Sequence, residues 1–225
     1  RIASSGADGT AKIWTLPFAA PTTVKSHDKS IAALTITHDG KQLISAGLDE
    51  WIRVYSLENQ QQTASWKSTI GPVTALAISA DDKLLVTGSN SGKWQSWSFP
   101  DHVEQQQQMG HAGGIHSIAI HPGSGEIATA GADGLVKLWK GAEMSRELAG
   151  HSGAVLAVAF TPDGASVISG GADASVRRWN VSDGAQVQVF SGHQGQITGV
   201  NVSADSATIV SSSLDKTIRI WTVAN

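Results

Sequence analysis

The chain has 225 residues, of which 40% are hydrophobic and 16% are charged, a balance that argues against disorder and is typical of a folded globular protein. Its 16 Lys and Arg and 19 Asp and Glu are interspersed and give a formal net charge of -3, so bulk electrostatics favour neither nucleic acid nor an anionic membrane as a partner. The sequence has no cysteine, which excludes disulfides, thiolate metal sites and cysteine nucleophiles, and no apolar run approaches the roughly 18 residues that cross a bilayer.

One nine-residue phrase recurs six times along the chain. In chain order it reads GADGTAKIW at 6–14, GLDEWIRVY at 47–55, SNSGKWQSW at 89–97, GADGLVKLW at 131–139, GADASVRRW at 171–179 and SLDKTIRIW at 213–221. Each copy leads from a tight turn into a short strand, and the copies end on Trp14, Tyr55, Trp97, Trp139, Trp179 and Trp221. These aromatics are 40 to 42 residues apart, a period that predicts the blades of a β-propeller.

Four short strands are predicted in each repeat, and the last three repeats define them best. The innermost strand is a nearly continuous apolar run, at 114–120, 154–160 and 196–202. The second strand follows a turn, at 127–131, 167–171 and 208–212, and the third strand ends on the recurring aromatic. The fourth strand, at 145–150 and 186–192, is more polar and is predicted to lie outermost. No apolar period of 3.6 residues is sustained, so the predicted fold class is all-β.

Polar residues recur at fixed distances before each aromatic. A His lies 28 residues earlier in four repeats, a Ser or Thr lies ten residues earlier in all six, and an Asp lies six residues earlier in five. The third repeat departs twice, with Thr69 in place of the His and Ser91 in place of the Asp. Because one orphaned buried polar group is costly, this joint loss indicates that the His, the hydroxyl and the Asp form one coupled network.

In the predicted network the Asp accepts from the His ring, the His meets the hydroxyl, and the hydroxyl meets the indole N–H. Its members are His27, Ser45, Asp49, His111, Thr129, Asp133, Trp139, His151, Ser169, Asp173, Trp179, His193, Ser211, Asp215 and Trp221. Ser, His and Asp also suggest a catalytic triad, but a hydrolase needs one triad with an oxyanion hole, not several copies without one. His38 and His121 fall in turns on separate repeats and are too few to hold a metal. We therefore predict no catalytic residue, no cofactor site and no metal site.

The residues at these spacings, with the Gly-His pairs at 110–111, 150–151 and 192–193, resemble the WD-repeat β-propeller family over the whole chain. The departures are Tyr55 in place of one Trp, Ser26 in place of Gly before His27, and no Asp after any terminal aromatic. The resemblance implies four-stranded antiparallel blades in a single propeller domain, 1–225, with six blades visible.

The phase of the repeat predicts that the first and last blades are incomplete. The first repeat begins at its second strand, and the chain ends just after the third strand of the sixth repeat. Propellers of this family usually have seven blades, so the resemblance implies that about one and a half repeats, roughly 60 residues, precede Arg1. A six-bladed ring and an exchange of blades between chains are the alternatives.

The resemblance also implies where a partner docks. In this family it is usually the face that carries the turns before the inner strands and before the third strands, here called the predicted partner face. Its residues are Ala7, Ser30, Ala32, Leu48, Pro72, Thr74, Asn90, Gly114, His116, Ala132, Ala154, Leu156, Ala172, Gln196, Thr198 and Leu214. None of them is Lys, Arg, Asp or Glu, which favours a neutral or apolar protein segment, or a neighbouring domain, over phosphopeptides, acidic tails or nucleic acid. The alternative is that these residues only build turns.

The resemblance implies a non-enzymatic scaffold for protein-protein interaction, with no nucleic-acid or membrane partner. Two alternatives remain open: an accessory propeller of a larger enzyme or electron-transfer protein, and a carbohydrate or small-ligand binder that uses the central channel. Trp51, Trp66 and Trp94 lie outside the recurring aromatics and are either interface anchors or packing between blades. Arg178 stands where most repeats have an aliphatic residue and is either a side-wall contact or a solvated charge. The sequence leaves the cellular compartment open.

Overall fold

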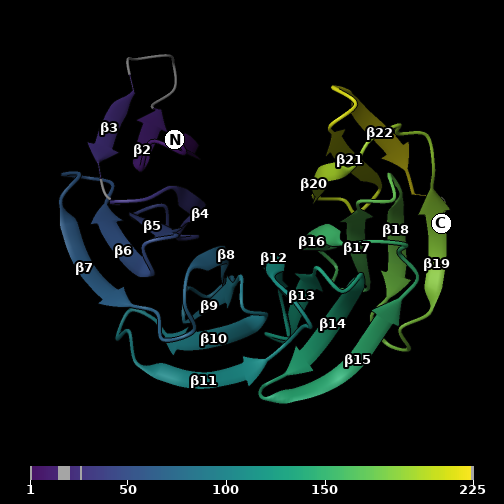
Figure 1. The fold of residues 1–225 in the computed structure, drawn as a ribbon, viewed down its shortest axis with the longest axis horizontal. Helices are drawn as coiled ribbons and strands as arrows, with labels where there is room; N and C mark the ends of the chain where they lie inside the picture. Colours follow the sequence, from purple (N-terminus) through teal and green to yellow (C-terminus); the bar gives the residue numbers. More distant parts are fainter. Residues whose placement is uncertain (1, 15–20, 26, 224–225) are drawn as a thin grey trace.

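The structure, a computed structural model, describes residues 2–14, 21–25 and 27–223. Within this part the prediction of an all-β fold built from antiparallel sheets is confirmed: the chain forms six such sheets, each of three or four strands that follow one another along the sequence. Figure 1 shows the sheets arranged as blades around a common centre, in an arc that begins at β2 and ends at β22. No helix among these residues is long and apolar enough to cross a membrane.

The strands divide among the blades as follows. Blade 1 has β1 (Ile2–Ser5), β2 (Thr10–Trp14) and β3 (Thr22–Lys25), and blade 2 has β4 (Ile31–Ile36), β5 (Gln42–Gly47), β6 (Trp51–Ser56) and β7 (Gln62–Lys67). Blade 3 has β8 (Val73–Ile78), β9 (Leu84–Ser89), β10 (Lys93–Ser98) and β11 (Glu104–Met109), and blade 4 has β12 (Ile115–Ile120), β13 (Ile127–Gly131), β14 (Leu135–Lys140) and β15 (Glu143–Ala149). Blade 5 has β16 (Val155–Phe160), β17 (Ser166–Gly171), β18 (Val176–Asn180) and β19 (Gln186–Phe190), and blade 6 has β20 (Ile197–Val202), β21 (Thr208–Ser213) and β22 (Ile218–Thr222).

The hydrophobic core lies between the blades rather than inside any one of them. The inner strands β4, β8, β12, β16 and β20 are neighbours around the centre, as Figure 1 shows. Each of the five apolar clusters joins two consecutive blades: one of them, for example, unites Val136 and Leu138 of blade 4 with Val155 and Trp179 of blade 5. An isolated blade would therefore leave both of its faces uncovered, and the blades stabilise one another by stacking.

A tight turn joins the second and third strands of every blade. The residue after the Asp position has positive φ in all six blades, at Gly9, Glu50, Gly92, Gly134, Ala174 and Lys216. Glycine adopts this left-handed conformation without cost, whereas a residue with a Cβ is strained there. The turn is held by the same hydrogen bonds with or without glycine: in blade 5, Ala174 N–H donates to Gly171 and Ser175 N–H donates to Asp173, as Gly134 and Leu135 do in blade 4.

Blade 6 presents an apolar face that no other described residue covers. Ile218 and Ile220 of β22 are 71% and 73% exposed. The equivalent residues of blade 4, Val136 and Leu138, are fully buried against blade 5. The exposures differ because blade 5 packs against blade 4, whereas nothing among the described residues packs on that side of blade 6.

Candidate functional site

The His, hydroxyl, Asp and Trp of blade 4 meet in one buried relay. Trp139 Nε1 donates to Thr129 Oγ1 at 2.9 Å, and Thr129 Oγ1 lies 2.8 Å from His111 Nε2. His111 Nδ1 in turn lies 2.8 Å from an Asp133 oxygen, and the other oxygen accepts the backbone N–H of Ala112 at 3.0 Å. The relay thus ties the turn before the inner strand to the turn before the third strand.

The same relay recurs in three other blades. The ring Nδ1 of His27, His151 and His193 lies 2.8, 3.0 and 2.8 Å from its Asp, and the Asp also accepts the backbone N–H that follows each His. The ring Nε2 lies 2.8 to 2.9 Å from the hydroxyl of the second strand in all three. Trp179 and Trp221 complete the relay in blades 5 and 6. In blade 2, by contrast, the Tyr55 hydroxyl donates to Gln62 on β7.

The relay suits a neutral His ring. The indole N–H can only donate, which leaves the hydroxyl its hydrogen and a second lone pair. A neutral ring with its proton on Nδ1 would donate to the carboxylate and accept from the hydroxyl at Nε2. Burial lowers the pKa of His111 and of His151, and the neighbouring Asp offsets this only in part, so both rings are neutral. Burial alone would raise the pKa of Asp173, but hydrogen bonds from Ser175 and His151 outweigh it and hold the pKa at about 2.

The relay does not form a catalytic site. The Ser169 hydroxyl, the candidate nucleophile of a triad, is fully buried and already accepts the Trp179 indole N–H at 2.8 Å. A nucleophile must reach its substrate, and this oxygen is enclosed by its own blade. The geometry instead fits a structural clamp that holds two turns together.

Blade 3 replaces the relay with a different buried network. Gln95 is fully buried, and its Nε2 donates to Thr69 Oγ1 at 2.7 Å. Ser91 donates to the Ile70 carbonyl at 3.0 Å and so links the same two turns that the Asp links elsewhere. Trp97 still points at Thr87, although its Nε1–Oγ1 distance is 3.4 Å.

Sequence reasoning missed Gln95, but a signal for it existed. It stands two residues before the aromatic, where the other five repeats have Lys12, Arg53, Lys137, Arg177 and Arg219. Where the Asp is present, this cation can pair with it: Arg53 lies 3.0 Å from Asp49. A repeat that has lost its Asp leaves such a cation unpaired, so the change to Gln accompanies the change to Ser91.

The structure brings the residues of the predicted partner face together in pairs. In each of blades 2 to 6 the backbone N–H of the residue before the Asp position donates to the carbonyl of the residue three after the His position, as Ala132 does to Gly114 at 2.9 Å. Thr74, His116 and their equivalents occupy a β-bulge at the start of each inner strand, where the pairing skips one residue. Bulges redirect side chains, and here they turn one residue of each inner strand toward this face. No residue of the face is buried.

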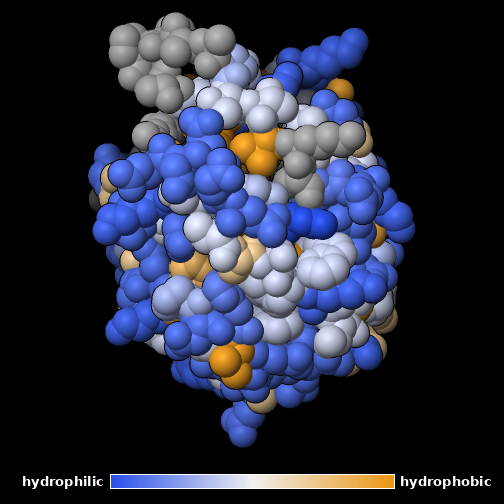
Figure 2. All heavy atoms as spheres, turned by 90° about the vertical axis from the view of Figure 1, so that its left-hand side faces the viewer, coloured by the Kyte–Doolittle hydropathy of each residue, from blue (hydrophilic) through white to orange (hydrophobic). Residues whose placement is uncertain are grey.

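The 16 residues of the predicted partner face include no Lys, Arg, Asp or Glu, but Asp28, Lys29 and Glu50 flank them in the same turns. His116 is the only imidazole of the face, and the loss of hydration at its position lowers the pKa of His116. Figure 2 shows hydrophilic side chains over most of the surface on the side of blades 1 and 2, with only scattered apolar ones.

The remaining candidates from the sequence take part in packing. Trp94 is fully buried edge-on against Trp139, and Trp66 packs edge-on against Trp97, so neither is an exposed anchor. Trp51 is half-buried under Arg53, whose guanidinium carbon lies 5.3 Å from its ring. The guanidinium of Arg178 is not a free side-wall charge, because its Nε donates to Ser166 at 3.0 Å.

The two turn histidines link neighbouring blades on the opposite face. His38 Nδ1 lies 3.1 Å from Asp82 of blade 3, and His121 Nε2 lies 3.1 Å from the Gly164 carbonyl of blade 5. Within the described part of the chain, no three His, Asp or Glu side chains converge to hold a metal ion.

The chain resembles known proteins both in its single repeats and over longer segments. The family model described as WD domain, G-beta repeat matches residues 20–56, 60–98, 103–140, 142–180 and 184–222. The chain is 29% identical to the target of rapamycin complex subunit wat1 of Schizosaccharomyces pombe over 64% of its length, and 28% identical to the target of rapamycin complex subunit LST8 of Saccharomyces cerevisiae over 56%. It is 33% identical to human Striatin-4 over 60%. The matches cover 46%, 42% and 20% of these relatives, so the chain spans less than half the length of each.

Proposed function

The chain belongs to the WD-repeat family, and on this premise we propose that it is a non-enzymatic scaffold that binds protein partners through the predicted partner face. WD-repeat proteins are typically protein-interaction scaffolds, and two relatives of this chain are named as subunits of a protein complex. The segment bound is neutral or apolar, or is a neighbouring domain of the same assembly.

One observation supports this function most directly: the 16 residues of the predicted partner face include no Lys, Arg, Asp or Glu, and none of the 16 is buried. Uncharged side chains lose little hydration free energy when a partner covers them, whereas a charge without an opposite charge on the partner would resist burial. The relays add rigidity, because each clamps two turns of its blade. A surface that is already ordered loses less conformational entropy when it binds a partner.

The experiment compares two triple variants of the chain in affinity capture with quantitative mass spectrometry. In the first, Ala32→Asp, Ala132→Asp and Leu214→Asp place three carboxylates on exposed positions of the predicted partner face. The matched control, Pro122→Asp, Pro162→Asp and Ala204→Asp, places three carboxylates on exposed turns of the opposite face. Both variants change the net charge equally, and thermal unfolding verifies that both remain folded.

The proposal expects a protein that the parent chain and the control retain but that the face variant loses. The captured protein is then titrated in purified form by calorimetry, with at least a tenfold weaker affinity expected for the face variant. Equal retention by both variants, or loss from the control alone, would assign binding to another surface.

A further inference from the structure

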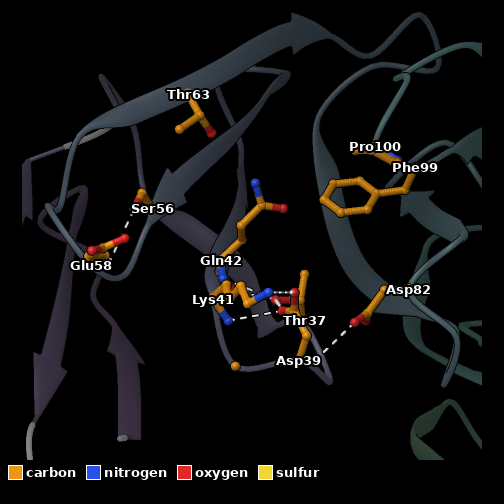
Figure 3. A pocket seen from close by; sticks show the side chains of 11 residues that line it. Thr37, Asp39, Lys41, Gln42, Ser56, Glu58, Thr63, Asp82, Phe99 and Pro100 are labelled. Carbon is orange, nitrogen blue, oxygen red and sulfur yellow. Dashed lines mark hydrogen bonds and ion pairs between the residues drawn. The ribbon is translucent and has the colours of Figure 1, made fainter.

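A second candidate site lies between blades 2 and 3, on the face opposite the predicted partner face. The cavity has a volume of about 570 Å³, and we call it the blade 2–3 groove. Blade 2 contributes Thr37, Asp39, Gly40, Lys41, Gln42, Ser56, Glu58 and Thr63, and blade 3 contributes Asp82, Phe99 and Pro100. Figure 3 shows the Gln42 side chain extending between the two blades toward the ring of Phe99, with Thr63 above it on the outer strand.

The same chain shows how the equivalent space between blades 4 and 5 is filled. There Arg146 of β15 reaches across to blade 5, where its Nε donates to the Val181 carbonyl at 3.1 Å and its Nη2 donates to the Ser182 carbonyl. Val181 and Ser182 follow the aromatic of blade 5 by two and three residues. Phe99 and Pro100, which line the blade 2–3 groove, follow the aromatic of blade 3 by the same distances.

The strand registers identify the residue that would fill the groove in blade 2. Arg146 pairs with Leu138, one residue before the aromatic of blade 4. In blade 2 the residue before the aromatic is Val54, and it pairs with Ala64. Ala64 therefore has a methyl group where blade 4 has the Arg146 side chain, and the groove lies beside it, lined by its neighbour Thr63.

The neighbouring polar pair changes in the same way. In blade 4 the Ser145 hydroxyl donates to the buried carboxylate of Glu126 at 2.6 Å. The equivalent positions of blade 2 are Thr63 and Gln42. Thr63 donates to the Val54 carbonyl instead. The Gln42 backbone N–H donates to Thr37 at 3.0 Å, but the Gln42 side-chain amide makes no hydrogen bond within the described part of the chain. Its carbonyl oxygen is thus available to a donor that enters the groove.

The charge of the lining favours a cation. Asp39, Glu58 and Asp82 contribute three carboxylates, and Lys41, the one basic residue among the lining residues, lies 3.7 Å from Asp39, so two carboxylates have no cation beside them in the lining. Asp82 accepts from the backbone N–H groups of His38 and Asp39 at 2.8 and 3.0 Å, so its carboxylate is held at the rim of the groove. Phe99, only 6% exposed, borders the groove on the side of blade 3 (Figure 3).

We propose that the blade 2–3 groove binds an arginine side chain of a partner protein, which takes the place that Arg146 takes between blades 4 and 5. The guanidinium donates to the Gln42 carbonyl oxygen and to the loop that carries Phe99, and the rim carboxylates balance its charge. This site is separate from the predicted partner face, so the chain would hold two partner segments on opposite sides.

The test is a titration of the isotopically labelled chain with the peptide acetyl-Gly-Arg-Gly-amide, followed by NMR. We expect saturable shifts of the Gln42 side-chain amide and of the Thr63 and Phe99 backbone amides. The same peptide with citrulline, which has the shape of arginine without its charge, should bind at least tenfold more weakly. Equal binding of the citrulline peptide, or shifts that gather elsewhere, would overturn the proposal.

Two variants test the analogy between the grooves. Ala64→Arg supplies the side chain from within and should weaken peptide binding at least tenfold, because the groove is then filled. Arg146→Ala should create a second site, seen as new peptide-dependent shifts at Val181 and Ser182. Gln42→Leu, which keeps the size of the side chain but removes its amide, serves as the further variant and should weaken binding several-fold with an unchanged unfolding temperature. Unchanged affinity in Ala64→Arg or in Gln42→Leu would contradict the proposed contacts.

Discussion

At the residue scale, the relays of blades 4, 5 and 6 share one fixed donor, the indole N–H of the recurring Trp. The Trp139 indole N–H occupies one lone pair of Thr129 Oγ1, and the hydroxyl keeps its hydrogen and a second lone pair for other partners. Burial favours the neutral ring of His111, which can accept the hydroxyl hydrogen at Nε2. The relay joins two groups that titrate, His111 and Asp133, so its stabilising effect depends on pH.

Replacing the hydroxyl at the centre of the relay should show how much the relay stabilises the fold. Thr129→Val keeps the shape of the side chain but leaves His111 Nε2 and Trp139 Nε1 buried without a partner, which should cost about 2 kcal/mol of unfolding free energy. The matched control is Thr87→Val in blade 3, where the only indole contact is 3.4 Å long and no His is present. Urea denaturation followed by tryptophan fluorescence measures both. Equal losses in the two variants would show that the relay adds nothing to the burial of a hydroxyl.

The Asp at the end of the relay should make blade 5 sensitive to acid. Its folded-state pKa of about 2 lies below the ordinary 3.8, so its contribution to stability is complete above pH 4 and is lost as the pH falls toward 2. Asp173→Asn should therefore be less stable than the parent at pH 7, and the difference should shrink as the pH falls from 4 to 2. Urea midpoints of both chains across this range give the difference curve. A difference that stays constant from pH 5 to pH 2 would contradict the assignment.

At the scale of the element, the turn between the second and third strands is where backbone conformation and packing meet. Gly92 has a φ of +81°, and a Cβ on it would overlap the carbonyl oxygens of His111 and Gly113 at the entrance to blade 4. Gly40, in the turn between the first and second strands of blade 2, has a φ of +69°, but its Cβ would meet nothing within 4 Å. The two glycines share a conformation and differ in their neighbours.

The two alanine variants separate these effects. Gly40→Ala should lower the free energy of unfolding by about 1 kcal/mol, because alanine is strained in the left-handed conformation. Gly92→Ala should lower it by about 3 kcal/mol, because the contact between blades 3 and 4 must also shift. Thermal and urea unfolding measure both variants. If Gly92→Ala proved no worse than Gly40→Ala, the close approach between the two blades would be absent in solution.

The sequence alone predicts the contacts that recur within each blade, but it predicts few of the contacts between neighbouring blades. The spacing of His111, Thr129 and Asp133 is fixed by the register of two adjacent strands, so it recurs in the sequence and the relay can be inferred from it. Arg146 contacts a loop 35 residues later in the chain. Because arginine does not recur at this position in the other repeats, the sequence pattern does not indicate the contact. The blade 2–3 groove is lined by residues of two blades, so it becomes visible only in the folded structure. The same holds for the proposed functional sites. The repeat is the unit that folds, whereas these sites lie where repeats differ or where two blades meet.

At the scale of the whole molecule, stability comes from a series of contacts between neighbouring blades. Each apolar cluster joins only two consecutive blades, so every blade face needs a cover of its own. Ile218 and Ile220 mark the one such face of blade 6 that no described residue covers, and Val210 of β21, 36% exposed, adjoins it opposite Ile220. The number of blades in a complete ring stays a prediction, but the chemistry of this face already determines how it behaves in water.

Residues 1–225, purified as such, should self-associate through the face of blade 6. Large exposed apolar side chains on a strand with an unpaired edge favour association between chains, so Ile218→Lys combined with Ile220→Lys should shift the chain toward monomer in sedimentation velocity at increasing concentration. Val187→Lys combined with Val189→Lys adds the same charge on β19, where the two valines are 53% and 40% exposed, and serves as the control. We expect the control to associate like the parent chain. If both pairs reduced association equally, net charge rather than the face of blade 6 would govern it.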